Sequence, residues 1–358
     1  MLLLLLTLTA LAHAQTEEAP LQGVFVGFFG NQAVVAQFGG EGELRGRFYY
    51  RRDGLDIVLE GGLQGGKYVL GERYPDARRG ILTLSWQRDD LNQRLLVGNH
   101  QLGQRSSLVL LRPVQRQDLI AALNAPLLEG WKRSDPYMFL KFDQPWQVGR
   151  LMRYGSIRLR WYTEPKSGVS LPRLEGRSPV NPTLADEHIR IAARALRCNA
   201  GAQTGWRQAT TLSWITRTNL SLRSVATTRC EAGGSDSFPA SMTFDLRSGK
   251  KLALEDFYRP TWVPRGYDPA KSEEFNFANF SEYLDRRKRV LTVRALLWNR
   301  STRLNPHCWG EESGLEPTDV LSADSWYLGR GGLTVQLDFP QGLNECDLEL
   351  TIPYAGLR

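Results

Sequence analysis

Residues 24–38 read VFVGFFGNQAVVAQF, which is two apolar runs separated by the turn residues Gly30 and Asn31. Short apolar or alternating runs between Gly-rich turns are typical of antiparallel β-strands. The pattern continues to residue 111, and the expected strands are Val24–Phe29, Ala33–Phe38, Leu44–Tyr50, Asp56–Glu60, Tyr68–Glu72, Ile81–Gln87, Leu95–His100 and Ser107–Leu111. Strands that recur about every 10–12 residues predict an all-β domain, a small barrel or a sandwich, over residues 15–113.

Two glycine motifs within this domain indicate hairpins. Arg52-Asp53-Gly54 carries the Asp-Gly pair that supports positive φ in tight turns. Gly61–Lys67 has the spacing of a phosphate-binding loop, but Tyr68 follows where a serine or threonine would meet magnesium. The motif also lies between two expected strands, with no helix to receive phosphate. We therefore expect a Gly-rich hairpin here and no nucleotide.

The remaining chain mixes helices and strands, so the expected fold class is α+β, with an all-β domain in front. Residues 114–155 form a connecting region with a helix over 114–130, and residues 156–358 form a mixed α+β domain. The strongest helix pattern covers 183–197, with Thr183 and Asp186 as a capping box. Four prolines between 165 and 182 predict a loop. Further expected elements are strands at 156–163, 208–215, 220–228, 241–245, 333–339 and 348–354, and a helix over 280–297.

The first 14 residues have the pattern of a secretory signal peptide. Leu2–Leu6 are five consecutive leucines, and Ala12-His13-Ala14 is a small-x-small cleavage site followed by polar residues. The apolar stretch is shorter than the roughly 20 residues of a transmembrane helix. We expect a mature chain that is periplasmic or secreted, with no membrane span. The alternative is a buried N-terminal helix or strand.

The chain has a net charge of +7, and its positively charged residues are scattered along the sequence. A basic balance indicates affinity for anionic lipid, cell-wall polymer or nucleic acid, or simply a well-solvated surface. The scattering favours the solvated surface, and export disfavours nucleic acid as a partner.

The four cysteines, Cys198, Cys230, Cys308 and Cys346, all lie in the C-terminal half. An even number of cysteines in an exported chain predicts disulfides, and four cysteines allow three connectivities. We favour Cys198–Cys230 and Cys308–Cys346, because each pair closes one local loop. A metal site needs closer spacing than these cysteines have, and His307-Cys308 is the remaining metal alternative.

No catalytic constellation is evident in the sequence. The chain contains neither a G-x-S-x-G elbow nor an H-E-x-x-H motif, so we assign no catalytic residue, metal or cofactor. A histidine-based triad in the mature chain would have to use His100, His188 or His307. Aromatic residues that either stack on sugars or pack in a core are Trp131, Trp146, Trp161, Tyr162, Trp206 and Trp214.

Residues 227–258 read TTRCEAGGSDSFPASMTFDLRSGKKLALEDFY, which is a Gly-Gly loop, a strand, a glycine turn and a helix start. This order resembles the extracellular C-terminal domain family of RsiV, a lysozyme-sensing anti-sigma factor. The likeness is carried by Gly233-Gly234, Thr243–Leu246, Gly249–Leu252 and Leu254–Tyr258. The segments Leu171–Gly176 and Ile352–Tyr354 extend it, so the resemblance covers residues 156–358.

The resemblance implies a domain of the bacterial envelope that binds another protein, lysozyme-type or other, without catalysis. The expected contact is the loop of Gly233, Gly234, Asp236, Phe238 and Pro239, for which a tight turn between two strands is the alternative. The expected function is therefore an exported, non-enzymatic binding protein, acting as an inhibitor or a protective factor. The alternatives are a hydrolase of cell-wall glycan, with carboxylates not identified, and a structural envelope protein.

Overall fold

The computed structural model describes residues 20–40, 44–73, 80–120, 123–198, 205–229, 236–257, 290–296, 298–299, 321–337 and 348–357. The expected signal peptide, residues 1–14, lies outside these ranges. The chain divides into two compact units. The first consists of residues 1–51 and 57–115, and the second of residues 52–56 and 116–358.

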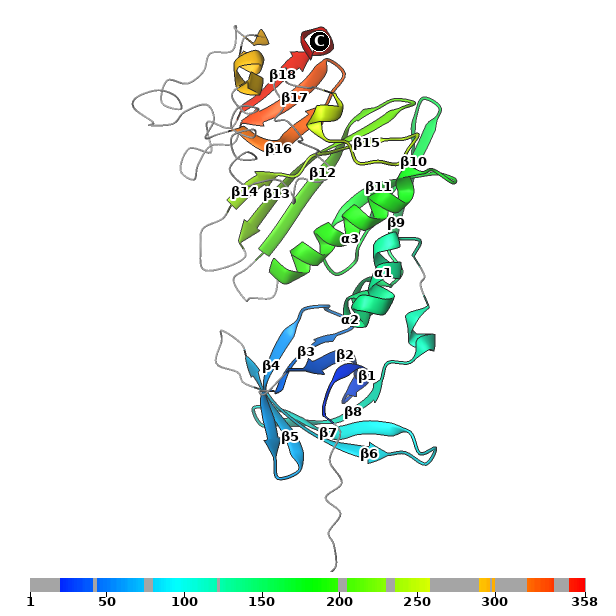
Figure 1. Cartoon of the computed structure of the whole chain (residues 1–358), viewed down its shortest axis with the longest axis vertical. Helices are drawn as coiled ribbons and strands as arrows, with labels where there is room; N and C mark the ends of the chain where they lie inside the picture. The colour runs from blue at the N-terminus through cyan, green and yellow to red at the C-terminus, as the bar shows by residue number, and fades with distance from the viewer. Residues whose placement is uncertain are drawn as a thin grey trace, which may run out of the picture. The chain divides into compact units, whose positions relative to one another are not determined.

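Eight antiparallel strands of the first unit form a closed barrel (Figure 1). Their bounds are β1 (Gly23–Phe29), β2 (Gln32–Gly39), β3 (Leu44–Tyr50), β4 (Ile57–Gln64), β5 (Lys67–Arg73), β6 (Ile81–Arg88), β7 (Arg94–Leu102) and β8 (Arg105–Pro113). Each strand pairs with the next, and β1 pairs with β8, which closes the sheet. All eight predicted strands are present, and of the two architectures that the sequence left open, barrel and sandwich, the structure forms the barrel.

Apolar side chains fill the barrel, because alternate residues of each strand point inward. On β2, for example, Val34, Ala36 and Phe38 are buried in the barrel core. The predicted Gly-rich hairpin is confirmed, since Gly65 and Gly66 join β4 to β5 with positive φ values of 55° and 77°. Positive φ at both central residues is the turn geometry that suits twisted antiparallel strands. The phosphate-loop motif is thus a β-hairpin.

The helix predicted over 114–130 is wrong as a single element. The described residues form a 3-10 helix, η1 (Arg116–Leu119), and a separate helix, α1 (Pro126–Ser134). Pro126 forces the break, because proline disfavours helical backbone in the residue before it, and Ala125 is extended. A second short helix, α2 (Pro136–Phe142), follows directly.

A three-stranded sheet comes next, in the order β11-β10-β9. Its strands are β9 (Gln147–Tyr154), β10 (Ile157–Thr163) and β11 (Ser170–Leu174). The predicted strand at 156–163 is confirmed as β10, whereas β11 lies in the proline segment that was predicted as a loop. Pro172 is tolerated in β11 because this strand is at the edge of the described sheet, where a missing N–H costs no ladder bond.

The long helix α3 (Val180–Cys198) confirms the helix predicted at 183–197 but begins earlier, so the predicted capping box is wrong. Thr183 lies inside the helix, and its Oγ1 donates to the backbone oxygen of Gly249 at 2.6 Å. The Asp186 Oδ1 atom accepts from the backbone N–H of Leu127 at 2.9 Å. Both side chains therefore bind other segments of the second unit instead of capping their own helix.

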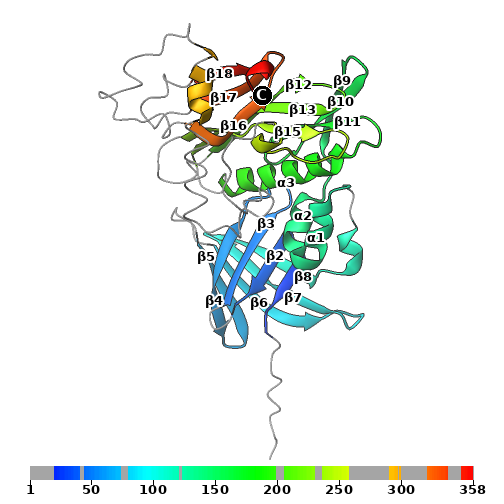
Figure 2. The same ribbon diagram turned by 45° about the horizontal axis from the view of Figure 1, so that its top comes forward.

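Helix α3 packs across a sheet of four strands (Figures 1 and 2). The strands are β12 (Gly205–Ile215), β13 (Asn219–Arg229), β14 (Asp236–Pro239) and β15 (Met242–Asp245). The order is β12-β13-β14, and β15 pairs with the other half of β13. The strands predicted at 208–215, 220–228 and 241–245 are confirmed as β12, β13 and β15, while β14 was not predicted.

The last described elements surround a second core. The strands β16 (Leu321–Leu328), β17 (Gly332–Leu337) and β18 (Leu348–Pro353) form one sheet, accompanied by η2 (Leu254–Asp256), a helical segment at 290–296 and η6 (Tyr354–Leu357). The strands predicted at 333–339 and 348–354 are confirmed as β17 and β18, and 290–296 is the described part of the helix predicted at 280–297. The described chain is therefore mostly β, with its helices in the second unit. No described helix combines the length and the apolar character needed to cross a membrane.

Candidate functional site

The predicted contact loop is a strand in its described part. Gly233 and Gly234 lie outside the described residues, whereas Asp236, Phe238 and Pro239 belong to β14. In the register with β13, Asp236 faces Thr228 and Pro239 faces Val225. Among the described strands β14 pairs with β13 alone, so its second edge carries backbone groups without a described strand partner. The described part of the segment predicted as a loop, Asp236–Pro239, thus lies at the edge of the described sheet.

The predicted disulfides remain predictions. Cys198 is the last residue of α3 and is buried. Cys230, Cys308 and Cys346 lie outside the described residues. The metal alternative at His307-Cys308 also falls outside them, and the described residues contain no cluster of ligands that could hold a metal ion.

The two described histidines are both buried, and in different units. His100 lies in the barrel core, where its Nε2 is 2.8 Å from Glu72 Oε1. His188 lies on α3, where its Nε2–H donates to the backbone oxygen of Val169 at 2.8 Å. The third candidate, His307, is outside the described residues. The structure therefore brings no two of these histidines together in a described triad.

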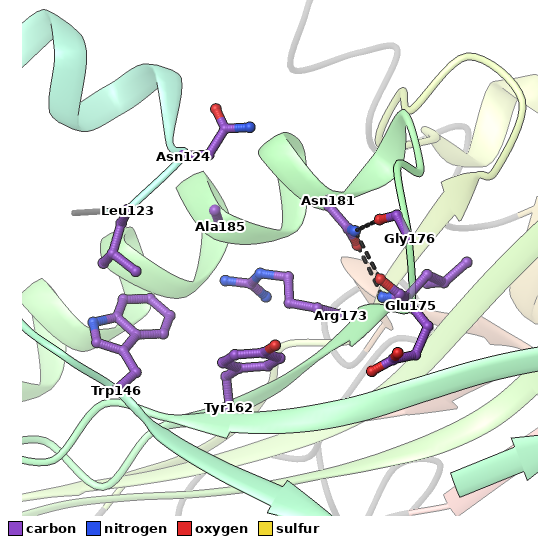
Figure 3. Close-up of a pocket in the computed structure, with 10 residues that line it drawn as sticks. Leu123, Asn124, Trp146, Tyr162, Arg173, Glu175, Gly176, Asn181 and Ala185 are labelled. Atoms are coloured by element: carbon purple, nitrogen blue, oxygen red, sulfur yellow. Dashed lines mark hydrogen bonds between the residues drawn. The ribbon is translucent and has the colours of Figure 1, made fainter. Parts of the chain in front are cut away.

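A cavity of about 340 Å³ lies in the second unit, beside β10, β11 and α3 (Figure 3). This volume is at the lower end of the roughly 300–1,000 Å³ range of small-molecule sites. The cavity is lined by Leu123, Asn124, Trp146, Tyr162, Arg173, Leu174, Glu175, Gly176, Asn181 and Ala185. Of the six aromatic residues considered for stacking, two, Trp146 and Tyr162, thus line the same cavity.

Arg173 is the central charged group of this cavity. It stands on β11, and its guanidinium carbon lies 5.6 Å from the ring centre of Trp146 and 5.9 Å from that of Tyr162. Figure 3 shows the side chain reaching across the cavity toward Trp146, above Tyr162. A cation against aromatic faces is stabilised by the ring quadrupoles, and more strongly where water is excluded.

The hydrogen bonds of Arg173 are few and go to neutral partners. Its Nη1 donates to the backbone oxygen of Pro172 at 3.0 Å. Its Nη2 lies 3.4 Å from Nδ1 of His188, and since Nε2–H of His188 is bound to Val169, Nδ1 is the acceptor. Burial, with the charge of Arg173 as a second cause, lowers the pKa of His188 to about 3, so this imidazole is neutral at pH 7.

No described carboxylate forms an ion pair with Arg173. The carboxylate whose charge acts on Arg173 is that of Asp186, which raises the pKa of Arg173, and Oδ1 of Asp186 accepts from the Leu127 N–H. Glu175, which also lines the cavity, is paired with Arg160 at 2.6 Å. Burial lowers the pKa of Arg173 to about 9, so the group is still a cation at pH 7.

The remaining lining residues fix the position of β11 and form an apolar wall of the cavity. Asn181 is fully engaged, because Oδ1 accepts from Leu174 N–H at 2.9 Å and Nδ2 donates to Leu174 O at 2.8 Å. Those two bonds tie the start of α3 to β11, the strand that carries Arg173. Leu123 and Ala185 supply apolar surface on the other side. This arrangement can bind an anion beside an apolar body, and it contains no described pair of groups positioned for acid–base exchange.

Sequence reasoning missed Arg173, since its partners come from β10, α3 and the segment before β9, and no local spacing connects them. No family model matches this chain, and no curated protein matches it. The candidate site is therefore defined by its geometry alone.

Proposed function

We propose that this chain is an exported, non-enzymatic binding protein of the bacterial envelope, and that its ligand is a lysozyme-type protein. The observation that carries the proposal is the edge strand β14 within the segment that the RsiV-like resemblance singles out. A strand edge that has no partner strand binds extended segments of another protein through backbone hydrogen bonds.

The elements around β14 add support. The order that follows it is β15, a turn at Gly249 and then η2, which is the strand, glycine turn and helix start of the resemblance. The turn is held to α3 by the bond from Thr183 to Gly249. The main core of the unit therefore fixes the elements beside the proposed contact.

The test is binding of the oxidised mature chain, residues 15–358, to hen-type lysozyme, with a muramidase assay alongside. Sub-micromolar binding with loss of muramidase activity is the expected result. Both proteins are basic, since this chain carries +7, so affinity should be no weaker at physiological salt than at low salt, where like charges repel most. Absence of binding at both salt concentrations would overturn the lysozyme assignment.

Variants locate the contact. Asp236→Lys combined with Phe238→Ala should weaken binding at least about tenfold, which corresponds to about 1.4 kcal/mol. Leu91→Ala is the matched control, because Leu91 is an exposed apolar residue in the turn between β6 and β7 of the barrel unit. An equal loss of lysozyme affinity in the double variant and in Leu91→Ala would contradict the proposal. Turnover of cell-wall glycan by the chain alone would contradict it as well.

The proposed export is tested by a separate experiment. Expression in a Gram-negative host with N-terminal sequencing of the periplasmic fraction should give a mature chain that starts at Gln15. Recovery of the uncleaved chain in the cytoplasm contradicts export.

A further inference from the structure

We propose that the cavity around Arg173 is a binding site for a small organic carboxylate with an apolar body. None of the residues that line this cavity belongs to β14, the strand of the proposed protein contact.

The first argument is the unbalanced charge. Arg173 is half-buried, and a cation that loses part of its hydration costs free energy unless it is paired. Arg173 has no ion pair with a described carboxylate. A guanidinium has five N–H groups, and the described residues accept from two of them, at Pro172 and His188. Five minus two leaves three donors for a ligand, which is enough for the two parallel bonds that a carboxylate forms with arginine.

The second argument is that the surroundings favour an anion. The neutral Nδ1 of His188 and the faces of Trp146 and Tyr162 hold the guanidinium in place without cancelling its charge. Asp186 acts on Arg173 through its charge and accepts a hydrogen bond from the Leu127 N–H, and Glu175 is paired with Arg160. A ligand carboxylate would therefore be the missing counter-charge.

The third argument concerns the body of the ligand. The wall facing Arg173 is formed by Leu123, Trp146 and Ala185, which offer no charged group. The cavity volume of about 340 Å³ suits a molecule the size of a single ring with a short acidic arm. A bare inorganic anion would leave that apolar wall without contact, so the geometry points to a carboxylate on an apolar body.

The experiment is a titration of the full mature chain with benzoate, benzyl alcohol and inorganic phosphate. Calorimetry and tryptophan fluorescence monitor the binding. Benzoate should bind saturably with a submillimolar Kd, and benzyl alcohol and phosphate at least about tenfold more weakly. No saturation by benzoate at about 10 mM overturns the site, and so does tighter binding of phosphate than of benzoate, which removes the apolar body from the ligand class.

Variants connect binding to the guanidinium. Arg173→Met should weaken benzoate binding at least about tenfold. Arg173→Lys should reduce the affinity less, because lysine keeps the positive charge but lacks the two parallel N–H groups of a guanidinium. Arg177→Met is the control, since Arg177 is an exposed arginine in the neighbouring bend and should leave the Kd unchanged. If Arg173→Met does not fold, Ala185→Leu fills the cavity with the arginine retained and should also abolish binding. Benzoate binding that survives in the folded variants overturns the proposal.

Discussion

In the barrel, Nε2 of His100 lies 2.8 Å from Oε1 of Glu72, and the two side chains are only 6% and 5% exposed. The second carboxylate oxygen of Glu72 accepts from the backbone N–H of Gly80 at 3.1 Å. The pair is surrounded by aromatic rings, with Phe29 centred 5.1 Å and Phe48 6.0 Å from the imidazole. Oε1 of Glu72 and Nε2 of His100 therefore depend on each other for a hydrogen bond.

The first prediction follows from this dependence. Replacing one partner, Glu72→Leu or His100→Leu, leaves the other buried without its bond and should lower the free energy of unfolding of the barrel by about 3–5 kcal/mol. The double variant should lose clearly less than the sum of the two single variants. Urea denaturation with hydrogen exchange of barrel peptides measures this, and strictly additive losses would contradict the coupling.

The second prediction is a pH dependence of the second unit. The folded-state pKa of His188 is lowered to about 3 by burial and then by Arg173, whereas the unfolded value is 6.5. The unfolded state therefore binds more protons between these values, so the contribution to stability is complete above pH 6.5 and is lost as the pH falls toward 3. The slope from this one group should approach about 1.4 kcal/mol per pH unit.

The matched variant for this experiment is His188→Gln, which keeps an N–H donor for Val169 and does not titrate. Unfolding free energies from pH 7 to 4, followed by exchange of peptides from α3, should fall more steeply in the parent chain than in the variant. The raised pKa of Asp186, caused first by burial, is common to both chains and cancels in the difference. Parallel pH curves would contradict a neutral, buried His188.

The third prediction concerns the turn after β15. Gly249 has φ +75°, and a Cβ there would lie 2.2 Å from the backbone oxygen of Pro179. Gly249→Ala should therefore be destabilising by about 2 kcal/mol more than Gly168→Ala, because Gly168 has φ +71° but open space around it. Thermal or urea unfolding compares the two, and equal losses would show that the turn can move away from α3.

How far the sequence predicts this structure depends on the range of the contacts. The barrel strands were predicted because each is defined by its own alternation and by its own turn, as at Gly65 and Gly66. The start of α3 was misplaced because Thr183 has a cap-like local pattern, while its partner Gly249 is 66 residues away. Local patterns therefore identified elements well, and the ends of elements less well.

The candidate site shows the same limit. Arg173 stands in a short strand that the prolines of its segment concealed, and its aromatic neighbours come from separate segments. The strand β14 was concealed in a similar way, because Gly234 and Pro239 near its ends indicated a loop. The segment is paired with β13, and no local sequence pattern indicates that pairing.

The last prediction is the pairing of the cysteines, Cys198–Cys230 and Cys308–Cys346. Non-reducing peptide mapping of the secreted chain should yield these two cross-linked pairs, and a peptide that joins Cys230 to Cys308 would contradict them. Cys198 ends α3 within the main core, so its cross-link restricts the loop from the helix past β12 and β13 in the unfolded chain. Removing that bond by Cys198→Ala with Cys230→Ala should cost about 3–4 kcal/mol of unfolding free energy, as for a loop of about 30 residues. The barrel unit contains no cysteine, so exchange protection of its peptides should stay unchanged, which separates loss of the cross-link from general misfolding.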